Sequence, residues 1–66
     1  MPRQRFVIYC AFGCHEFTLK EEGSPQESTF RSIMDALIFA RRQKAPEGAR
    51  VAVLSPFGGV MMETVI

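Results

Sequence analysis

The amino-acid sequence predicts a small α+β domain with the element order strand, strand, helix, strand, strand. Two apolar runs near the N-terminus and two near the C-terminus are rich in β-branched and aromatic residues. Between them, one segment repeats its apolar residues with a helical period. We therefore expect a ββαββ domain, in which a four-stranded, mainly antiparallel sheet carries one helix on one face.

The first hairpin is predicted from two runs on either side of Gly13. Residues 5–12 are apolar at both odd and even positions, a pattern typical of a strand that is covered on both faces. Residues 15–20 alternate instead, with Phe17 and Leu19 on one face and polar residues on the other. We expect this second strand to pair antiparallel with the first.

The segment from residue 21 to residue 31 contains Gly23, Ser24 and Pro25 and has no sustained period, so it is predicted to be a loop. A short extension of the sheet near residues 28–30 is the alternative. Both Ser24 and Ser32 are followed three positions later by an acidic residue, as helix N-caps often are. We favour Ser32 as the start of the helix.

The helix is predicted from an apolar stripe that follows the i, i+3, i+4, i+7 rule and ends before Pro46 and Gly48. The stripe consists of Ile33, Ala36, Leu37 and Ala40. Phe39 points away from it, at about 100° of rotation per residue, and is therefore expected to be exposed or covered by another part of the molecule.

A second hairpin is predicted after the helix. Residues 50–55 form a short apolar run, Gly58 and Gly59 follow Pro56 and Phe57 as turn residues, and residues 60–66 form the returning strand. The Gly58-Gly59 pair matches no phosphate-binding motif, because a strand follows it in place of a helix.

Length and composition limit the possibilities. A chain of 66 residues holds one domain, and 47% hydrophobic with 23% charged residues is a globular composition. The net charge of +1 provides no broad field that would attract nucleic acid or an anionic membrane. The apolar runs are far shorter than the roughly 20 residues of a membrane span, so we expect a cytoplasmic protein.

The small size also favours self-association. Area scaling gives a folded surface of roughly 4,200 Å² for this mass, so only about 60% of the chain's surface is buried on folding. One helix covers only one face of a sheet, and several apolar residues of the first and last strands are left over. We expect a homodimer or another protein partner, with Val7, Tyr9, Phe39 and Met61 at the contact. The alternative is that residues 21–31 fold over the second face.

The sequence indicates no enzyme, no cofactor and no metal site. Cys10, Cys14 and His15 combine the ligand types that zinc prefers, but their spacing is not C-x2-C and no fourth ligand is evident. Adjacent Cys14 and His15 point to opposite faces of a strand, which excludes a Cys-His catalytic pair. We interpret both cysteines as reduced thiols. The carboxylates lie on predicted loops and solvent faces.

A nucleic-acid-binding domain is the second hypothesis. Arg41, Arg42, Lys44 and Arg50 form a basic cluster at the predicted C-terminus of the helix. Such a patch next to a sheet with aromatic residues is a known arrangement for weak nucleic-acid binding. The same cations also complement the negative end of the helix dipole.

Residues 30–41 resemble the helix of small bacterial ββαββ domains of unknown function. In those domains the helix opens with an aromatic residue, a capping Ser or Thr, an acidic residue and Ala, and later carries Ala-Arg. The resemblance continues through residues 48–53 and the Gly58-Gly59 turn. The expected fold also resembles the half-sheet of HicB-type antitoxin domains, which implies a protein or nucleic-acid partner.

Overall fold

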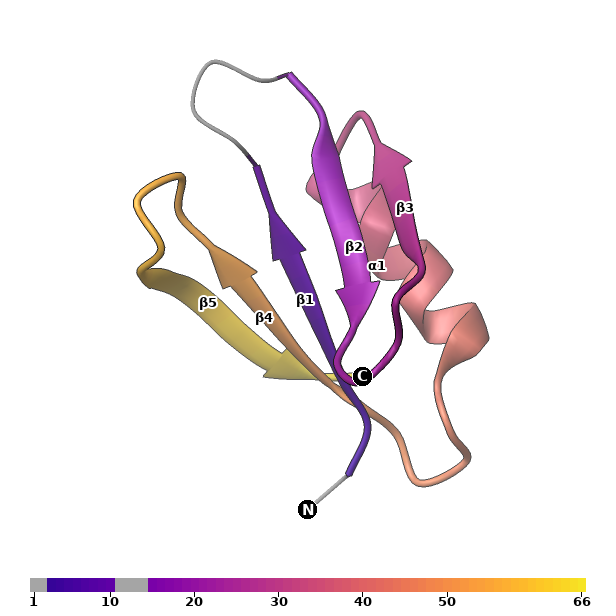
Figure 1. The fold of residues 1–66 in the computed structure, drawn as a ribbon. Helices are drawn as coiled ribbons and strands as arrows, with labels where there is room; N and C mark the ends of the chain where they lie inside the picture. The colour runs from indigo at the N-terminus through magenta and orange to yellow at the C-terminus, as the bar shows by residue number, and fades with distance from the viewer. Residues whose placement is uncertain (1–2, 11–14) are drawn as a thin grey trace.

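A computed structural model describes residues 3–10 and 15–66 of the chain. These residues form one five-stranded sheet in the spatial order β3-β2-β1-β4-β5 and one helix, α1, which lies against one side of the sheet (Figure 1). The elements are β1 (Arg5–Tyr9), β2 (Phe17–Glu21), β3 (Glu27–Phe30), α1 (Ile33–Gln43), β4 (Arg50–Leu54) and β5 (Val60–Val65).

The predicted four-stranded, mainly antiparallel sheet is wrong. Residues 27–30 form the edge strand β3 and pair antiparallel with β2, so the loop prediction is wrong there and the alternative of a short sheet extension near residues 28–30 is confirmed. The central pair β1 and β4 is parallel, so the sheet is mixed. The reason is the crossover: α1 carries the chain from the edge strand β3 across to β4, and strands joined by a crossover helix can lie parallel.

The antiparallel pairing of both predicted hairpins is confirmed, although β1 ends at Tyr9 and the predicted end of that strand at residues 11–12 and its turn at Gly13 lie outside the described residues. In the first, β1 pairs antiparallel with β2, with Ile8 opposite Leu19. In the second, β4 pairs antiparallel with β5 through a turn in which Gly58 has a φ of 91°, a value that favours glycine. The register of this second pair shifts between Val53 and Leu54, so Met61 lies at a bulge.

The predicted helix and its start are also confirmed. Ser32 is the N-cap, and its Oγ accepts a hydrogen bond from the Asp35 amide at 3.1 Å. Gln43 is the last residue of the helix. Two positions later, the backbone amide of Ala45 donates a hydrogen bond to the Gln4 side chain at 2.6 Å. The Gln4 amide nitrogen in turn donates to the Gln43 carbonyl at 3.2 Å, which ties the end of α1 to the start of β1.

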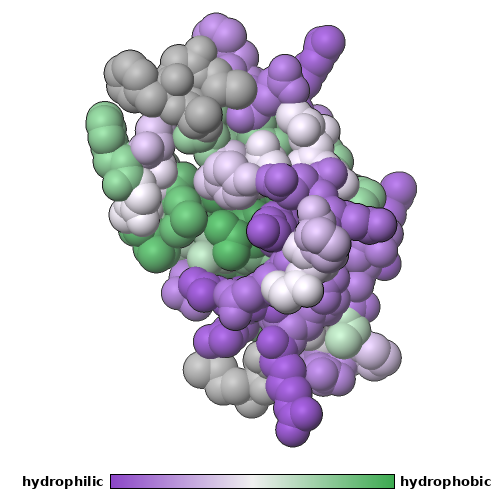
Figure 2. Space-filling view, viewed as in Figure 1, coloured by the Kyte–Doolittle hydropathy of each residue, from purple (hydrophilic) through white to green (hydrophobic). Residues whose placement is uncertain are grey.

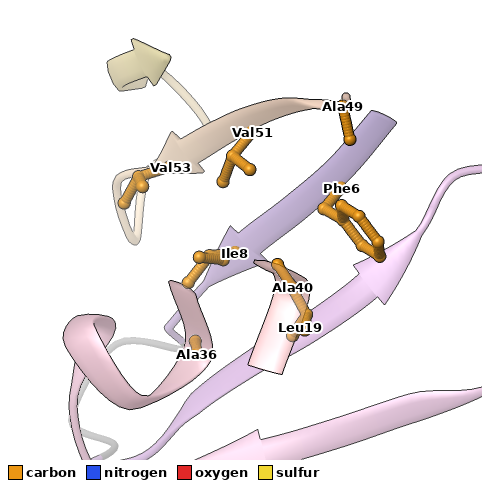
Figure 3. Close-up of a cluster of buried hydrophobic side chains, with 8 residues drawn as sticks. All are labelled: Phe6, Ile8, Leu19, Ala36, Ala40, Ala49, Val51 and Val53. Carbon is orange, nitrogen blue, oxygen red and sulfur yellow. The ribbon is translucent and has the colours of Figure 1, made fainter. Parts of the chain in front are cut away.

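The core lies between α1 and the sheet (Figure 3). Its buried side chains come from alternate positions of the three inner strands and from the alanines of the helix, which permit a close approach. They are Phe6, Ile8, Leu19, Ala36, Ala40, Ala49, Val51 and Val53. Ile33 and Leu37 of the predicted stripe are partly buried against this cluster.

The opposite side of the sheet, which we call the open face, carries no helix from the described part of the chain. Successive strand residues point to opposite faces, so Arg5, Val7 and Tyr9 lie on the open face of β1 when Phe6 and Ile8 face the core. Ala52 is fully buried but lies outside the core cluster, because Val51 and Val53 on either side of it point toward α1. Side chains of the adjacent strands on the open face therefore bury Ala52, without a second layer of structure over that face.

Candidate interaction surface

The last strand of the sheet and the adjoining side of α1 expose large apolar side chains. The helix contacts β1, β2 and β3, so it leaves the β5 side of the sheet uncovered. Figure 2 shows apolar side chains gathered over the β4 and β5 side of the sheet and polar ones over the β2 and β3 side. We call the following residues the β5 surface: Met34, Ile38, Val60, Met61, Met62 and Val65.

A groove of about 300 Å³ runs between α1 and β5. Met34, Leu37 and Ile38 line it from the helix, and Met62 and Thr64 line it from the strand. Arg41 is the charged residue of this lining. Met34 is 65% exposed and Met62 is 44% exposed, although both lie beside the core. The groove therefore offers apolar area that the monomer does not bury.

The free edge of β5 presents backbone hydrogen-bonding groups at alternate residues. Ala49 and Ile66 exchange both of their backbone hydrogen bonds, at 2.9 and 3.2 Å. Because bonded and non-bonded pairs alternate along an antiparallel ladder, Met62 and Thr64 also direct their amides and carbonyls toward β4. Glu63 and Val65 direct theirs away from the sheet.

The open face carries a transverse row of charged residues at one end of β1 and β4. The Arg5 Nη1 atom lies 3.1 Å from the Glu22 carboxylate. Arg5 also stands directly beside Arg50 in the parallel pair, and Arg50 stands beside Val65 of β5. The Nε atoms of both arginines are buried and have no hydrogen-bond partner among the described residues. Glu22 is thus the carboxylate that faces this pair of arginines from the β2 side.

Tyr9 and Val7 lie on the open face as half-buried residues. They line a hollow of about 430 Å³ with Leu54 and with the turn at Glu22 and Gly23. The Tyr9 hydroxyl donates a hydrogen bond to the Glu27 carboxylate of β3. This hydrogen bond, partial burial and the charge of Glu27 raise the pKa of Tyr9 above its usual value. Residues 21–31 therefore border the open face without folding over it.

Phe39 and Met61, the other two predicted contact residues, differ in exposure. Phe39 is partly buried against the core, and its ring lies 5.3 Å from that of Phe30, centroid to centroid. The aromatic side chain that the helical wheel directs away from the stripe is thus covered by β3. Met61 is 65% exposed at the bulge of β5.

The four predicted cations lie on two sides of the sheet. Arg41 and Arg42 belong to the last turn of α1, and Lys44 is its C-cap. Arg50 alternates with the core residue Val51 and therefore projects from the open face, away from the helix. The cations at the helix end complement its dipole.

In residues 3–10 and 15–66, no group of three or more His, Cys, Asp or Glu residues is placed to hold a metal ion. Cys14, one of the three residues that the sequence did not favour as zinc ligands, lies outside the described residues. His15 is exposed beside a shallow hollow that Glu16, Thr29 and Arg31 also line. No helix of the described part of the chain is long and apolar enough to cross a membrane.

Comparison with known proteins finds no protein-family model, no curated protein and no solved structure that matches this chain. The resemblance to small ββαββ domains and to HicB-type antitoxin domains stays a prediction.

Proposed function

We propose that this domain is a non-enzymatic protein-interaction module that forms a homodimer through the β5 surface. The observation that carries the proposal is the exposure of β5 on both faces and along its free edge: Val65 on the open face is 60% exposed and Met62 in the groove is 44% exposed. Edge strands are commonly protected by lysine, proline or short length. β5 has six residues, and Glu63 is the charged one among them.

A second copy of the chain can cover the β5 surface of both molecules with a single two-fold contact. The accessible surface of the molecule is 4669 Å², about 470 Å² more than area scaling gives for a monomer of this mass. A standard interface removes about 800 Å² from each partner. A two-fold contact uses the same patch twice, so it covers the excess on both copies with one interface.

Nucleic-acid binding stays a prediction without support from the arrangement of the cations. Arg50 projects from the open face, whereas Arg41, Arg42 and Lys44 belong to the end of α1 on the other side of the sheet. The proposal therefore concerns a protein partner, and specifically a second copy.

The test is the mass in solution, measured by light scattering coupled to size exclusion over a range of concentrations. We expect a dimer whose mass changes little with salt, because the contact is mainly apolar. Met62→Glu places a charge in the groove and should give a monomer with an unchanged circular dichroism spectrum. Phe57→Glu is the matched control, since Phe57 is 86% exposed in the turn before β5 and lies outside the β5 surface. A monomeric wild-type protein at all concentrations would overturn the proposal.

A further inference from the structure

We infer that two copies join by antiparallel pairing of β5 with β5, in the register that places Thr64 on the two-fold axis and sets Arg50 against the partner's Glu63. This inference rests on the proposed homodimer and specifies its geometry. It makes one continuous sheet across both copies, with the α1 helices on the same side.

The backbone limits the registers that are available. Only Glu63 and Val65 of the regular part of β5 direct amides and carbonyls outward, so they must form the hydrogen-bonded pairs of the new ladder. With Thr64 on the axis, Glu63 pairs with the partner's Val65, and Val65 pairs with the partner's Glu63. Each of the two pairs then exchanges both of its hydrogen bonds.

Charge selects among these registers. A shift that puts Glu63 on the axis sets two carboxylates directly opposite each other, which is destabilising. A shift that puts Val65 on the axis extends the row as Arg50, Val65, the partner's Val65 and the partner's Arg50, and adds no carboxylate. Only the register with Thr64 on the axis brings an acidic residue into the row of Arg50.

The row of charges on the open face becomes complete in that register. Within one chain it reads Glu22, Arg5, Arg50 and Val65, with the Glu22 carboxylate 3.1 Å from Arg5. The next position across the interface is the partner's Glu63, two strand spacings from Arg50, or about 10 Å between Cα atoms. The arginine and glutamate side chains together span this distance across the small side chain of Val65. Arg50, which stands beside Arg5 in the monomer and has its own chain's Glu63 as a diagonal neighbour on β5, then gains the partner's Glu63 in its own row.

The helix side of the sheet is compatible with the same register. Thr64 faces Thr64 of the partner subunit, a cross-strand pair that is favourable in antiparallel sheets. Met62 faces the partner's Ile66, so the partner strand extends the apolar wall of the groove between α1 and β5.

Disulfide cross-linking tests the register. A non-bonded pair in an antiparallel ladder has a Cα separation of about 4.5 Å, within the 4.4–6.8 Å range of disulfides. Thr64→Cys should therefore form a covalent dimer under mild oxidation. Met62→Cys is the matched control on the same face, because its partner residue is displaced by four strand positions, or about 13 Å. Peptide mapping assigns the bond, and oxidised wild-type protein accounts for the native cysteines.

A second measurement tests the ion pair without new cysteines. Arg50→Gln and Glu63→Gln should each raise the dimer dissociation constant roughly two- to fivefold at low salt, and the double variant should be little weaker than either alone. Additive effects would overturn the pairing of Arg50 with the partner's Glu63. Stronger cross-linking of Met62→Cys than of Thr64→Cys, or none from either in a dimeric protein, would overturn the register while leaving the homodimer intact. A monomeric wild-type protein would overturn both.

Discussion

Tyr9 and Arg50 show how neighbouring strands decide the environment of a residue on the open face. Tyr9 lies two strands from β3, yet its hydroxyl reaches the Glu27 carboxylate. Arg50 lies beside Arg5 on one side and Val65 on the other, so no acidic residue of its own row adjoins it. In both cases the strand order brings together residues that are distant in the sequence, and their electrostatics follow from it.

Tyr9→Phe should remove a pH-dependent part of the stability. The hydrogen bond to Glu27 is the largest cause that raises the pKa of Tyr9 in the folded state above its unfolded value near 10. The neutral phenol is therefore favoured by folding, and its contribution is full below pH 10 and lost as the pH rises through the folded pKa. At neutral pH we expect a loss well under about 1 kcal/mol, since the pair is accessible to solvent.

Urea unfolding of both proteins from about pH 8 to about pH 11 provides the measurement. Groups other than Tyr9 are common to both proteins, so the informative quantity is the difference between the two urea midpoints at each pH. That difference should shrink as the pH rises. A difference that stays constant over the whole range would contradict the role of the Tyr9 hydroxyl.

Single residues were predictable from the sequence where their environment is local. The exposure of Met61 follows from its place in the last strand. Phe39 was predicted to be exposed or covered by another segment, and that segment is β3, through Phe30. The row of Arg5, Arg50 and Val65 was not predictable, because it requires the parallel register of β1 with β4.

At the level of elements, α1 depends on a short-range signal at its start. The Ser32 Oγ accepts a hydrogen bond from the Asp35 backbone amide, which has no hydrogen-bond acceptor inside the helix. Ser24, the alternative start in the sequence, accepts a hydrogen bond from the Gln26 amide at 3.3 Å within a turn. The two serines therefore have similar local bonds but different consequences for the fold.

Ser32→Ala should lower the free energy of unfolding by about 1 kcal/mol, since an alanine cannot cap the first turn. Ser24→Ala is the matched control and should cost less than about 0.5 kcal/mol, because it lies in an exposed segment. Urea midpoints at an unchanged slope measure both effects. Equal losses from the two variants would show that capping does not distinguish Ser32.

Elements with a local pattern were predicted correctly, whereas the edge strand β3 was only an alternative and the parallel pairing of β1 with β4 was not predicted. The hairpins and α1 follow from alternation, turn residues and an apolar stripe within short windows. β3 has the sequence Glu-Ser-Thr-Phe, which lacks an apolar alternation, and it becomes a strand because β2 offers it a free edge. The missing strand also explains why the sheet was expected to be antiparallel, since β3 is the start of the crossover to β4.

At the scale of the whole molecule, one short helix is too narrow for a five-stranded sheet. α1 contacts β1, β2 and β3, and the core ends at Val51 and Val53 of β4. β5 is therefore held mainly by its ladder with β4, and its apolar side chains face solvent on both sides. The sequence predicted a surplus of apolar surface, but only the strand order places much of that surplus on β5.

If the β5 surface is covered by a second copy, thermal stability depends on protein concentration. Association of folded chains stabilises the native state by mass action, and a tenfold rise in concentration contributes about 1.4 kcal/mol per dimer, or about 0.7 kcal/mol per chain. For a domain of this size that shift raises the Tm by about 3–6 °C.

Calorimetry of the wild-type protein and of Met62→Glu over a hundredfold range of concentration measures this dependence. The wild-type Tm should rise at each step. The Tm of Met62→Glu should be lower and constant, because a charge in the groove prevents association. The core between α1 and the inner strands stays in place in this variant. Phe57→Glu should retain the wild-type dependence. A wild-type Tm that does not change with concentration would mean that β5 stays exposed in solution, and that the ladder with β4 alone holds it in the fold.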